Sequence, residues 1–203
     1  MGARNTDANF GSVAKWFHWL TAACFLVCFM VVWFRHYIAE FKSDAWHSSL
    51  DYHIMAGWTV LALVLPRLYW RYKNVHPIEP PGSKLEHLGA RLGHWALYAM
   101  MIVMPITGYM GTHDDSNIYG LFSIPTLQDT AIWRVVFVGM LDLTWDQVET
   151  FADFVHKDIL GAWFLWILIL VHIGAGLYHH YVRKDTTLVR MLPGTSAPET
   201  EEA

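Results

Sequence analysis

The chain has little charge and almost no cysteine. Only 16% of its 203 residues are charged and 54% are hydrophobic, whereas soluble domains carry charge on about a quarter of their residues. This composition argues against an ordinary soluble domain. The two cysteines, Cys24 and Cys28, both lie in an apolar run. A disulfide framework or a thiolate metal site therefore lacks the residues that it needs.

A surplus of basic residues is also missing. The 14 Lys and Arg residues are outnumbered by 18 Asp and Glu, so the net charge is −4 with His neutral. A surface that gathers phosphates needs the opposite balance, and we expect no nucleic-acid partner. At roughly 150 residues per domain, the length fits one domain.

The four longest stretches without Asp, Glu, Lys or Arg are residues 16–34, 52–66, 92–112 and 159–182. Because a helix needs about 20 residues to cross the hydrocarbon core of a bilayer, the first, third and fourth are long enough. The second becomes long enough if Arg67 extends to the interface and the helix continues to Trp70. We predict an all-α integral membrane four-helix bundle with spans at about 14–36, 48–70, 90–112 and 157–182.

The segments outside these spans complete the predicted organisation. Residues 1–11 form an N-terminal cytoplasmic segment, residues 12–192 the bundle, and residues 193–203 a tail rich in Pro, Thr and Glu that is expected to be disordered. The first span is expected to remain as an anchor, because Trp33, Phe34 and Arg35 stand where small residues would mark signal cleavage.

The basic residues orient the four predicted spans. Ten Lys and Arg lie on the side that holds both termini, against four on the other side, which places both termini in the cytoplasm of a multi-pass protein. The connection at about 113–155 would then face outward with seven carboxylates. Its apolar stretch 132–143 is too short to span the bilayer and is expected to form a helix at the interface.

Histidine is unusually common for so apolar a chain. Of twelve His, six lie in or just beside the predicted spans: His18, His53, His94, His172, His179 and His180. Ionisable side chains are costly inside a bilayer and therefore indicate function. Neutral imidazole binds metals, and two imidazoles on opposite faces of a porphyrin give a six-coordinate iron suited to electron transfer.

Depth in the membrane pairs the candidate ligands. His18 enters the first span from the inner side, and His172 lies about ten residues from the inner end of the fourth. His53 opens the second span from the outer side, and His156 lies just before the fourth on that side. We therefore pair His18 with His172 and His53 with His156, as facing helices of a bundle bring such ligands together.

Glycines follow these histidines and fit a flat cofactor. Gly57 lies one turn after His53, and Gly174 and Gly176 follow His172. A macrocycle packs closely only against a helix that lacks a side chain there. The alternative is that each glycine only lets two helices approach.

Several motifs occur in a family-specific order. The first span holds Lys15-Trp-Phe-His18, the second His53-Ile-Met-Ala-Gly57 with Arg67 fourteen residues after the His, the third Leu92-Gly93-His94 with Tyr98, Pro105 and Gly108, and the fourth His172-Ile-Gly-Ala-Gly-Leu-Tyr-His179-His180. Over about residues 12–193 the chain resembles the bacterial di-haem cytochrome b561 family.

The resemblance implies a bacterial inner-membrane protein with four helices and two b haems, each held by two His. By motif, His18, His53 and His172 match the family's ligands. It also implies electron exchange with ubiquinone and an electron donor at the outer face. A sharper version is a superoxide:ubiquinone oxidoreductase, although the acidic outer connection would repel an anion. The resemblance leaves open whether the chain is such an enzyme or only an electron carrier.

The chain departs from the family at its remaining ligand. The family usually separates the two ligands of the last helix by fourteen residues, about 21 Å of rise and a rotation of about −40°. Here Asp158 occupies that place and His156 lies sixteen residues before His172. On a regular helix His156 would point about 160° away, so its use as a ligand requires a π-bulge or an unwound turn near Gly161. His47 and His113 are the reserve candidates.

Two other functions are compatible with the residues. The chain could be the haem b subunit of a dehydrogenase or hydrogenase that docks on the outer connection, or a carrier that binds a transported metal ion. Carriers usually show broken helices and paired half-repeats, which we do not find in the sequence. For His94 the alternatives are contact with a haem edge or quinone and a hydrogen bond between helices.

Overall fold

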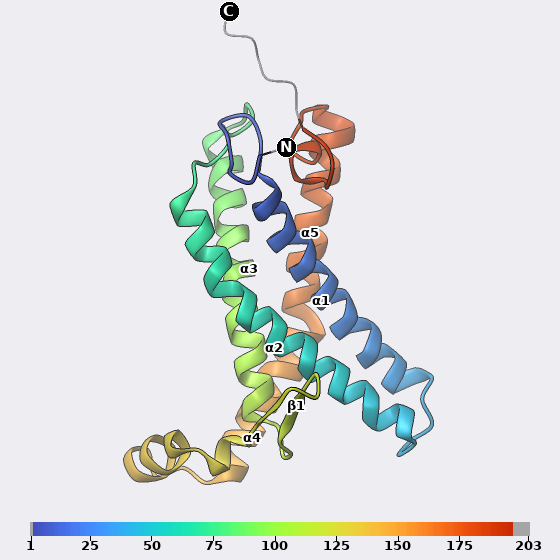
Figure 1. The fold of residues 1–203 in the computed structure, drawn as a ribbon, viewed down its shortest axis with the longest axis vertical. Helices are drawn as coiled ribbons and strands as arrows, with labels where there is room; N and C mark the ends of the chain where they lie inside the picture. Colours follow the sequence, from blue (N-terminus) through green and yellow to red (C-terminus); the bar gives the residue numbers. More distant parts are fainter. Residues whose placement is uncertain (1, 197–203) are drawn as a thin grey trace, which may run out of the picture. The chain divides into compact units, whose positions relative to one another are not determined.

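A computed structural model of the chain describes residues 2–196. It is mostly helical, as predicted (Figure 1). The long helices are α1 (Ser12–Tyr37), α2 (Asp44–Lys73), α3 (Lys84–Met110) and α5 (Leu165–Tyr178). Two π-helical segments flank α5, η3 (Phe154–Phe164) before it and η4 (His179–Arg183) after it.

The shorter elements lie between α3 and η3 and after η4. They are β1 (Ser116–Ile118), β2 (Phe122–Ile124), the 3-10 helix η1 (Leu127–Asp129), the π-helix η2 (Trp133–Met140), α4 (Trp145–Asp153) and the 3-10 helix η5 (Val189–Met191). The strands β1 and β2 pair antiparallel, with Ile118 opposite Phe122. In the loop between them Tyr119 and Gly120 have positive φ angles of 53° and 70°. The sequence analysis did not predict this hairpin.

The chain divides into two compact units. Unit 1 contains Met1–Ala22, Ala62–Ala99 and Trp166–Ala203, and unit 2 contains Ala23–Leu61 and Met100–Leu165. The boundary passes through α1, α2, α3 and the junction of η3 and α5. Each predicted histidine pair falls within one unit, His18 and His172 in unit 1 and His53 and His156 in unit 2.

Three helices are long and apolar enough to cross a membrane: Ser12–Tyr37, Asp44–Lys73 and the continuous helix Trp145–Arg183. The second predicted span, whose apolar run is short, is among them because its helix is 30 residues long. The third predicted span is not, although α3 has 27 residues.

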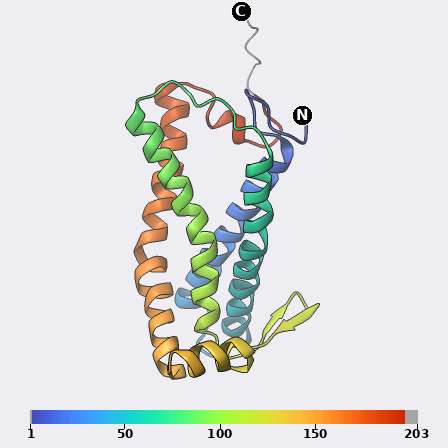
Figure 2. The ribbon, with the colours of Figure 1, turned by 90° about the vertical axis from the view of Figure 1, so that its left-hand side faces the viewer.

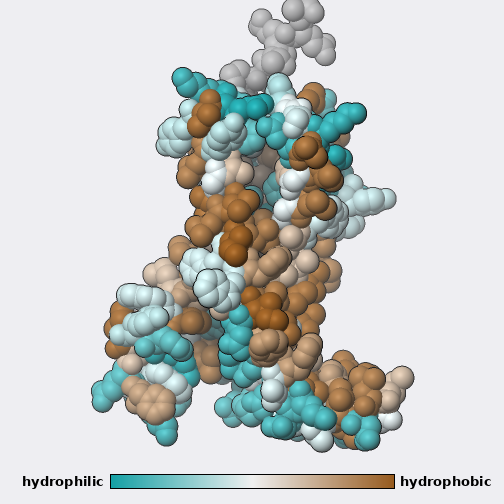
Figure 3. All heavy atoms as spheres, turned by 180° about the vertical axis from the view of Figure 1, so that it is seen from behind, coloured by the Kyte–Doolittle hydropathy of each residue, from teal (hydrophilic) through white to brown (hydrophobic). Residues whose placement is uncertain are grey.

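Large apolar side chains on these helices are open to the surroundings, as contact with lipid requires. Leu65 and Trp163 are each 70% exposed, and Leu26 is 60% exposed. On the face in Figure 3, hydrophobic side chains gather along the long helices and hydrophilic ones at the helix ends.

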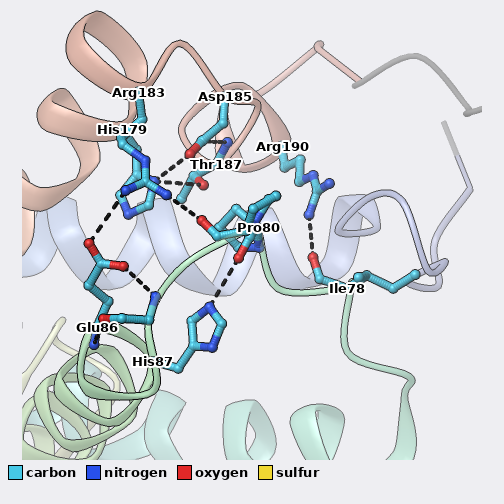
Figure 4. Close-up of polar contacts among 11 residues, drawn as sticks. Ile78, Pro80, Glu86, His87, His179, Arg183, Asp185, Thr187 and Arg190 are labelled. Atoms are coloured by element: carbon cyan, nitrogen blue, oxygen red, sulfur yellow. Dashed lines mark hydrogen bonds and ion pairs between the residues drawn. The ribbon is translucent and has the colours of Figure 1, made fainter.

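Polar contacts join the connection at residues 78–87 to residues 179–190 within unit 1 (Figure 4). His179 Nδ1 lies 2.5 Å from a carboxylate oxygen of Asp185, and Arg183 contacts Glu86 at 3.4 Å. Burial would raise the pKa of Asp185, but hydrogen bonds from His179 and Thr187 outweigh it and hold that pKa below its ordinary value. Helix η4 ends at Arg183, and its C-cap residue Lys184 has a left-handed conformation with φ of 55°.

The buried Lys15 holds the last described residues. Its Nζ donates to the carbonyl oxygens of Leu192 at 3.0 Å and Thr195 at 2.5 Å, and Trp19 Nε1 donates to the carbonyl of Met191 at 2.8 Å. The predicted disordered tail therefore begins with residues that make defined contacts. Residues 197–203 of that tail lie outside the described residues.

In unit 2, η2 lies in the segment between the hairpin and α4 (Figure 2), and α4 continues directly into η3. Helix α4 starts at a capping box, in which the Thr144 side chain accepts from the backbone of Gln147 and the Gln147 side chain accepts from the backbone of Thr144. The apolar stretch predicted to be helical does contain η2, whose Val135 and Met140 are 61% and 74% exposed. This exposure suits a helix at a membrane interface.

Candidate functional site

The first candidate centre joins α1 and α5 within unit 1. The ring centroids of His18 and His172 lie 6.0 Å apart, with their planes tilted by 50°. We call these two residues the unit 1 pair. A third imidazole, that of His94 on α3, packs edge-on against His172 with centroids 5.5 Å apart.

A guanidinium contacts the unit 1 pair. Arg67 Nη2 lies 3.2 Å from Nδ1 of His18, and its Cζ lies 5.3 Å from the centre of the Tyr98 ring. Because guanidinium only donates hydrogen bonds, Nδ1 of His18 is the acceptor, and the proton of the neutral ring is on Nε2. Binding of a metal through Nε2 would require that proton to move to Nδ1 and Arg67 to turn away from it.

The second candidate centre joins α2 and η3 within unit 2. The ring centroids of His53 and His156 lie 6.0 Å apart, nearly perpendicular at 84°. We call these two residues the unit 2 pair. The reserve candidates lie elsewhere: His47 bonds the carbonyl of Ser43 at 2.9 Å, and His113 pairs with Glu149 at 2.5 Å.

Backbone carbonyls fix the proton positions of the unit 2 pair. Nδ1 of His156 donates to the carbonyl oxygen of Met104 at 2.9 Å, and Nδ1 of His53 lies 3.3 Å from the carbonyl oxygen of Cys28. Since a carbonyl only accepts, the proton of each neutral ring is on Nδ1, which leaves the Nε2 lone pair for a metal. Metal-binding histidines commonly donate their other N–H in this way.

The helix that carries His156 is π-helical from Phe154 to Phe164. A π-helix makes fewer degrees of rotation per residue than an α-helix, so the sixteen-residue separation from His172 does not carry the ring to the opposite face. The sixteen-residue spacing predicted a helix distortion of this kind near Gly161, if His156 is to be a ligand. Its result is that the His156 ring meets His53.

Both pairs have the dimensions of a two-imidazole metal site. Two imidazoles that bind one metal ion from opposite sides have ring centres about 6 Å apart, because each metal–nitrogen bond is about 2 Å long. There is also space beside the helices: a Cβ added at Gly57 or Gly174 would meet no atom within 4 Å. The donor set and the open helix faces therefore fit a planar cofactor bound between two histidines.

A protein-family model matches nearly the whole chain. The family model described as prokaryotic cytochrome b561 matches residues 9–194. The chain belongs to the prokaryotic cytochrome b561 family. Cytochromes b561 are membrane proteins that bind haem b and transfer electrons, and the apolar helices and histidine pairs agree with this membership.

Individual cytochromes b561 are similar along nearly the whole chain. Cytochrome b561 homolog 2 of Escherichia coli K12 is 28% identical over 206 residues, covering 97% of this chain and 98% of that protein. Cytochrome b561 homolog 1 of the same organism is 25% identical, covering 91% and 97%. A protein of Yersinia pestis named probable superoxide oxidase CybB is 25% identical, covering 87% and 91%.

Sequence reasoning missed several groups around the pairs. The carbonyls of Met104 and Cys28 belong to the backbone, which leaves no signal in residue type. Thr107, whose Oγ1 lies 3.2 Å from Nδ1 of His156, is an ordinary helix residue in the sequence. Gly108 was noted only as part of the family motif, although a Cβ there would lie 2.9 Å from the His156 ring.

Proposed function

We propose that this cytochrome b561 binds two b haems, one at each histidine pair, and transfers electrons between a donor at the outer membrane face and ubiquinone. The observation that carries the proposal is the pair of matched distances: His18 to His172 and His53 to His156, each 6.0 Å between ring centroids. Both pairs come from helices far apart in the sequence.

The four histidines would act as axial ligands. When bound, each haem supplies an iron that accepts and releases one electron at a time. The chain's own part is to hold that iron between two neutral imidazoles and to exclude water from it. In the unit 2 pair the carbonyls of Met104 and Cys28 orient the rings, and such hydrogen bonds fix the tautomer and the orientation of a metal-binding histidine.

Membrane position supports the electron route. The distribution of basic residues along the sequence favours cytoplasmic termini in the inner membrane. The unit 2 pair would then lie toward the outer side and the unit 1 pair toward the cytoplasmic side. The proposal assigns donor oxidation to the outer side and leaves the lipid-soluble quinone to exchange electrons within the bilayer.

Superoxide is the specific donor that one comparison favours, because a relative is named probable superoxide oxidase CybB. Oxidation of two superoxide ions would release two O₂ and supply two electrons, which with two protons from water reduce one ubiquinone to ubiquinol. The segment 113–155 holds seven carboxylates against one Arg, and its field opposes the approach of an anion. A donor protein, as for a haem b subunit of a dehydrogenase or hydrogenase, is the alternative that this charge does not oppose.

A redox experiment on the purified protein tests the proposal. The reduced-minus-oxidised spectrum is expected to show b-type bands, and a potentiometric titration is expected to need two one-electron components. Ubiquinol and superoxide are then supplied separately as reductants in stopped-flow mixing. Rapid reduction by superoxide supports the oxidase, whereas reduction by quinol alone supports an electron carrier that serves another donor. A colourless protein from haem-supplemented cells contradicts the proposal and favours a metal-ion carrier.

A further inference from the structure

His156 reaches its partner from an irregular helix. Along the sequence it lies sixteen residues before His172, a spacing that puts the two side chains on opposite faces of a regular α-helix. In the structure the helix is π-helical from Phe154 to Phe164, and the His156 ring contacts His53. The features that hold this distortion and this ring in place determine whether the unit 2 pair exists.

Gly161 permits the π-helical turn. In a π-helix the carbonyl of each residue accepts a hydrogen bond from the backbone N–H five positions later. Gly161 stands five positions after His156. A Cβ added at Gly161 would lie 2.6 Å from the carbonyl oxygen of His156. Because this atom belongs to the backbone, a side chain at position 161 forces the turn itself to change.

Gly108 leaves room for the imidazole on the facing helix α3. A Cβ at this position would lie 2.9 Å from Cε1 and 3.3 Å from Nδ1 of His156, where ordinary van der Waals contact begins at 3.4 Å. The ring cannot retreat freely, because Nδ1 is bonded to the carbonyl of Met104 on the same helix, at 2.9 Å. A methyl group at position 108 therefore pushes the ring away from that carbonyl and changes its direction toward His53.

Thr107 adds a hydroxyl to the same anchor. It is buried, and its Oγ1 lies 2.8 Å from the carbonyl of Val103 and 3.2 Å from Nδ1 of His156. The hydroxyl proton goes to a helix carbonyl, so the oxygen accepts from the imidazole N–H. One turn of α3, from Met104 to Gly108, thus supplies the carbonyl, the hydroxyl and the empty space that His156 uses.

We propose that Gly108 and Gly161, with Thr107, are positioning residues for His156: Gly161 allows the π-helical turn that directs the imidazole to His53, and the Thr107–Gly108 turn holds the imidazole there. The inference rests on the proposed function, in which the unit 2 pair holds a haem. It adds the residues that let His156 reach His53 although His156 lies sixteen residues before His172.

The test substitutes Gly108→Ala and Gly161→Ala separately in the full-length protein. The matched control is Gly89→Ala, on the same helix α3, where the glycine is exposed and an added Cβ meets nothing within 4 Å. Measurements are haem b per chain, the rate of haem transfer to excess apomyoglobin, and the low-temperature EPR signal of each low-spin haem. The haem at the unit 1 pair reports in every sample whether the bundle is still folded.

Loss of a group behind a metal ligand typically weakens metal binding about 10–100-fold. We expect Gly108→Ala and Gly161→Ala to weaken haem retention at the unit 2 pair by that factor and to shift its EPR signal, with the unit 1 haem and Gly89→Ala unchanged. Thr107→Val is expected to shift the same signal. Thr107→Ser, which keeps the hydroxyl, is expected to leave that signal as in the wild type.

Two results overturn the inference. The first is that Gly108→Ala and Gly161→Ala both keep the wild-type EPR signal and haem retention at the unit 2 pair, while His156→Ala loses that haem. The other is that Thr107→Ser shifts the signal as much as Thr107→Val. If His156→Ala itself leaves both haems in place, the ligand assignment in the proposed function is wrong, which is a different failure. If Gly161→Ala does not accumulate in membranes, Gly108→Ala and the two Thr107 variants decide.

Discussion

The pairing of histidines predicts a specific pattern of haem loss. Substituting His172→Ala would remove one of the two proposed ligands at the unit 1 pair, and His53→Ala would do the same at the unit 2 pair. The two pairs share no residue, and each lies within its own unit. Each single variant is therefore expected to lose one haem of two, which halves the amplitude of the reduced-minus-oxidised difference per chain.

Double variants make the prediction sharper. His18→Ala combined with His172→Ala is expected to lose no more haem than either alone, since both would ligate the same iron. His53→Ala combined with His172→Ala is expected to lose both. Sites that act independently add their effects, and residues of one site do not. The assay is haem b per chain by the pyridine method, with the EPR signals identifying the component that remains.

The pairing is refuted if His18→Ala and His53→Ala remove the same spectral component, or if the double variant of the unit 1 pair loses all haem while remaining folded. Resistance to proteolysis in the detergent-solubilised protein serves as the control for folding. The His36→Ala variant, which changes a histidine outside both pairs, is the matched control and is expected to keep two haems.

Three further predictions follow from contacts within unit 1. His94→Ala is expected to keep both haems and to shift only the unit 1 EPR signal, because its ring packs against His172; loss of a haem would show that it is a ligand. Lys15→Met removes charge-assisted bonds to the last described carbonyls and is expected to cost about 2 kcal/mol of unfolding free energy, measured by chemical denaturation; an unchanged midpoint would contradict this. The lowered pKa of Asp185 means that its contact stabilises the fold above the carboxyl's ordinary pKa of about 3.9 and is lost as pH falls through the lowered value. Asp185→Asn is therefore expected to flatten the pH dependence of thermal stability below about pH 4, and an unchanged profile would argue against it.

The sequence was sufficient to predict the long helices, because an apolar run of about 20 residues favours a helix long enough to cross a bilayer. The uncharged runs were less reliable for the bounds of the helices. The apolar run of the second span ends at Pro66, yet α2 continues from Asp44 to Lys73, since charged residues at helix ends need only reach the interface. The third span has a longer uncharged run, yet α3 is not among the three described helices that are apolar enough to cross a membrane.

The histidine pairs could be predicted by depth, because helix rise fixes how far each residue lies from the end of its span. The direction of His156 could not. A count of sixteen residues shows that a regular helix fails, but the extent of the π-helix depends on which carbonyls and side chains crowd the backbone. That information is in contacts such as Gly161 with the carbonyl of His156. The β1–β2 hairpin was missed because its strands have three residues each.

The most direct test of the account is the number of b haems per polypeptide in wild-type protein purified from cells with ample haem, with quantitative EPR of the oxidised form. We predict two haems per chain, both low-spin with two imidazole ligands. A preparation that is folded yet holds no haem, or only one, would contradict the claim that the two histidine pairs are two haem sites.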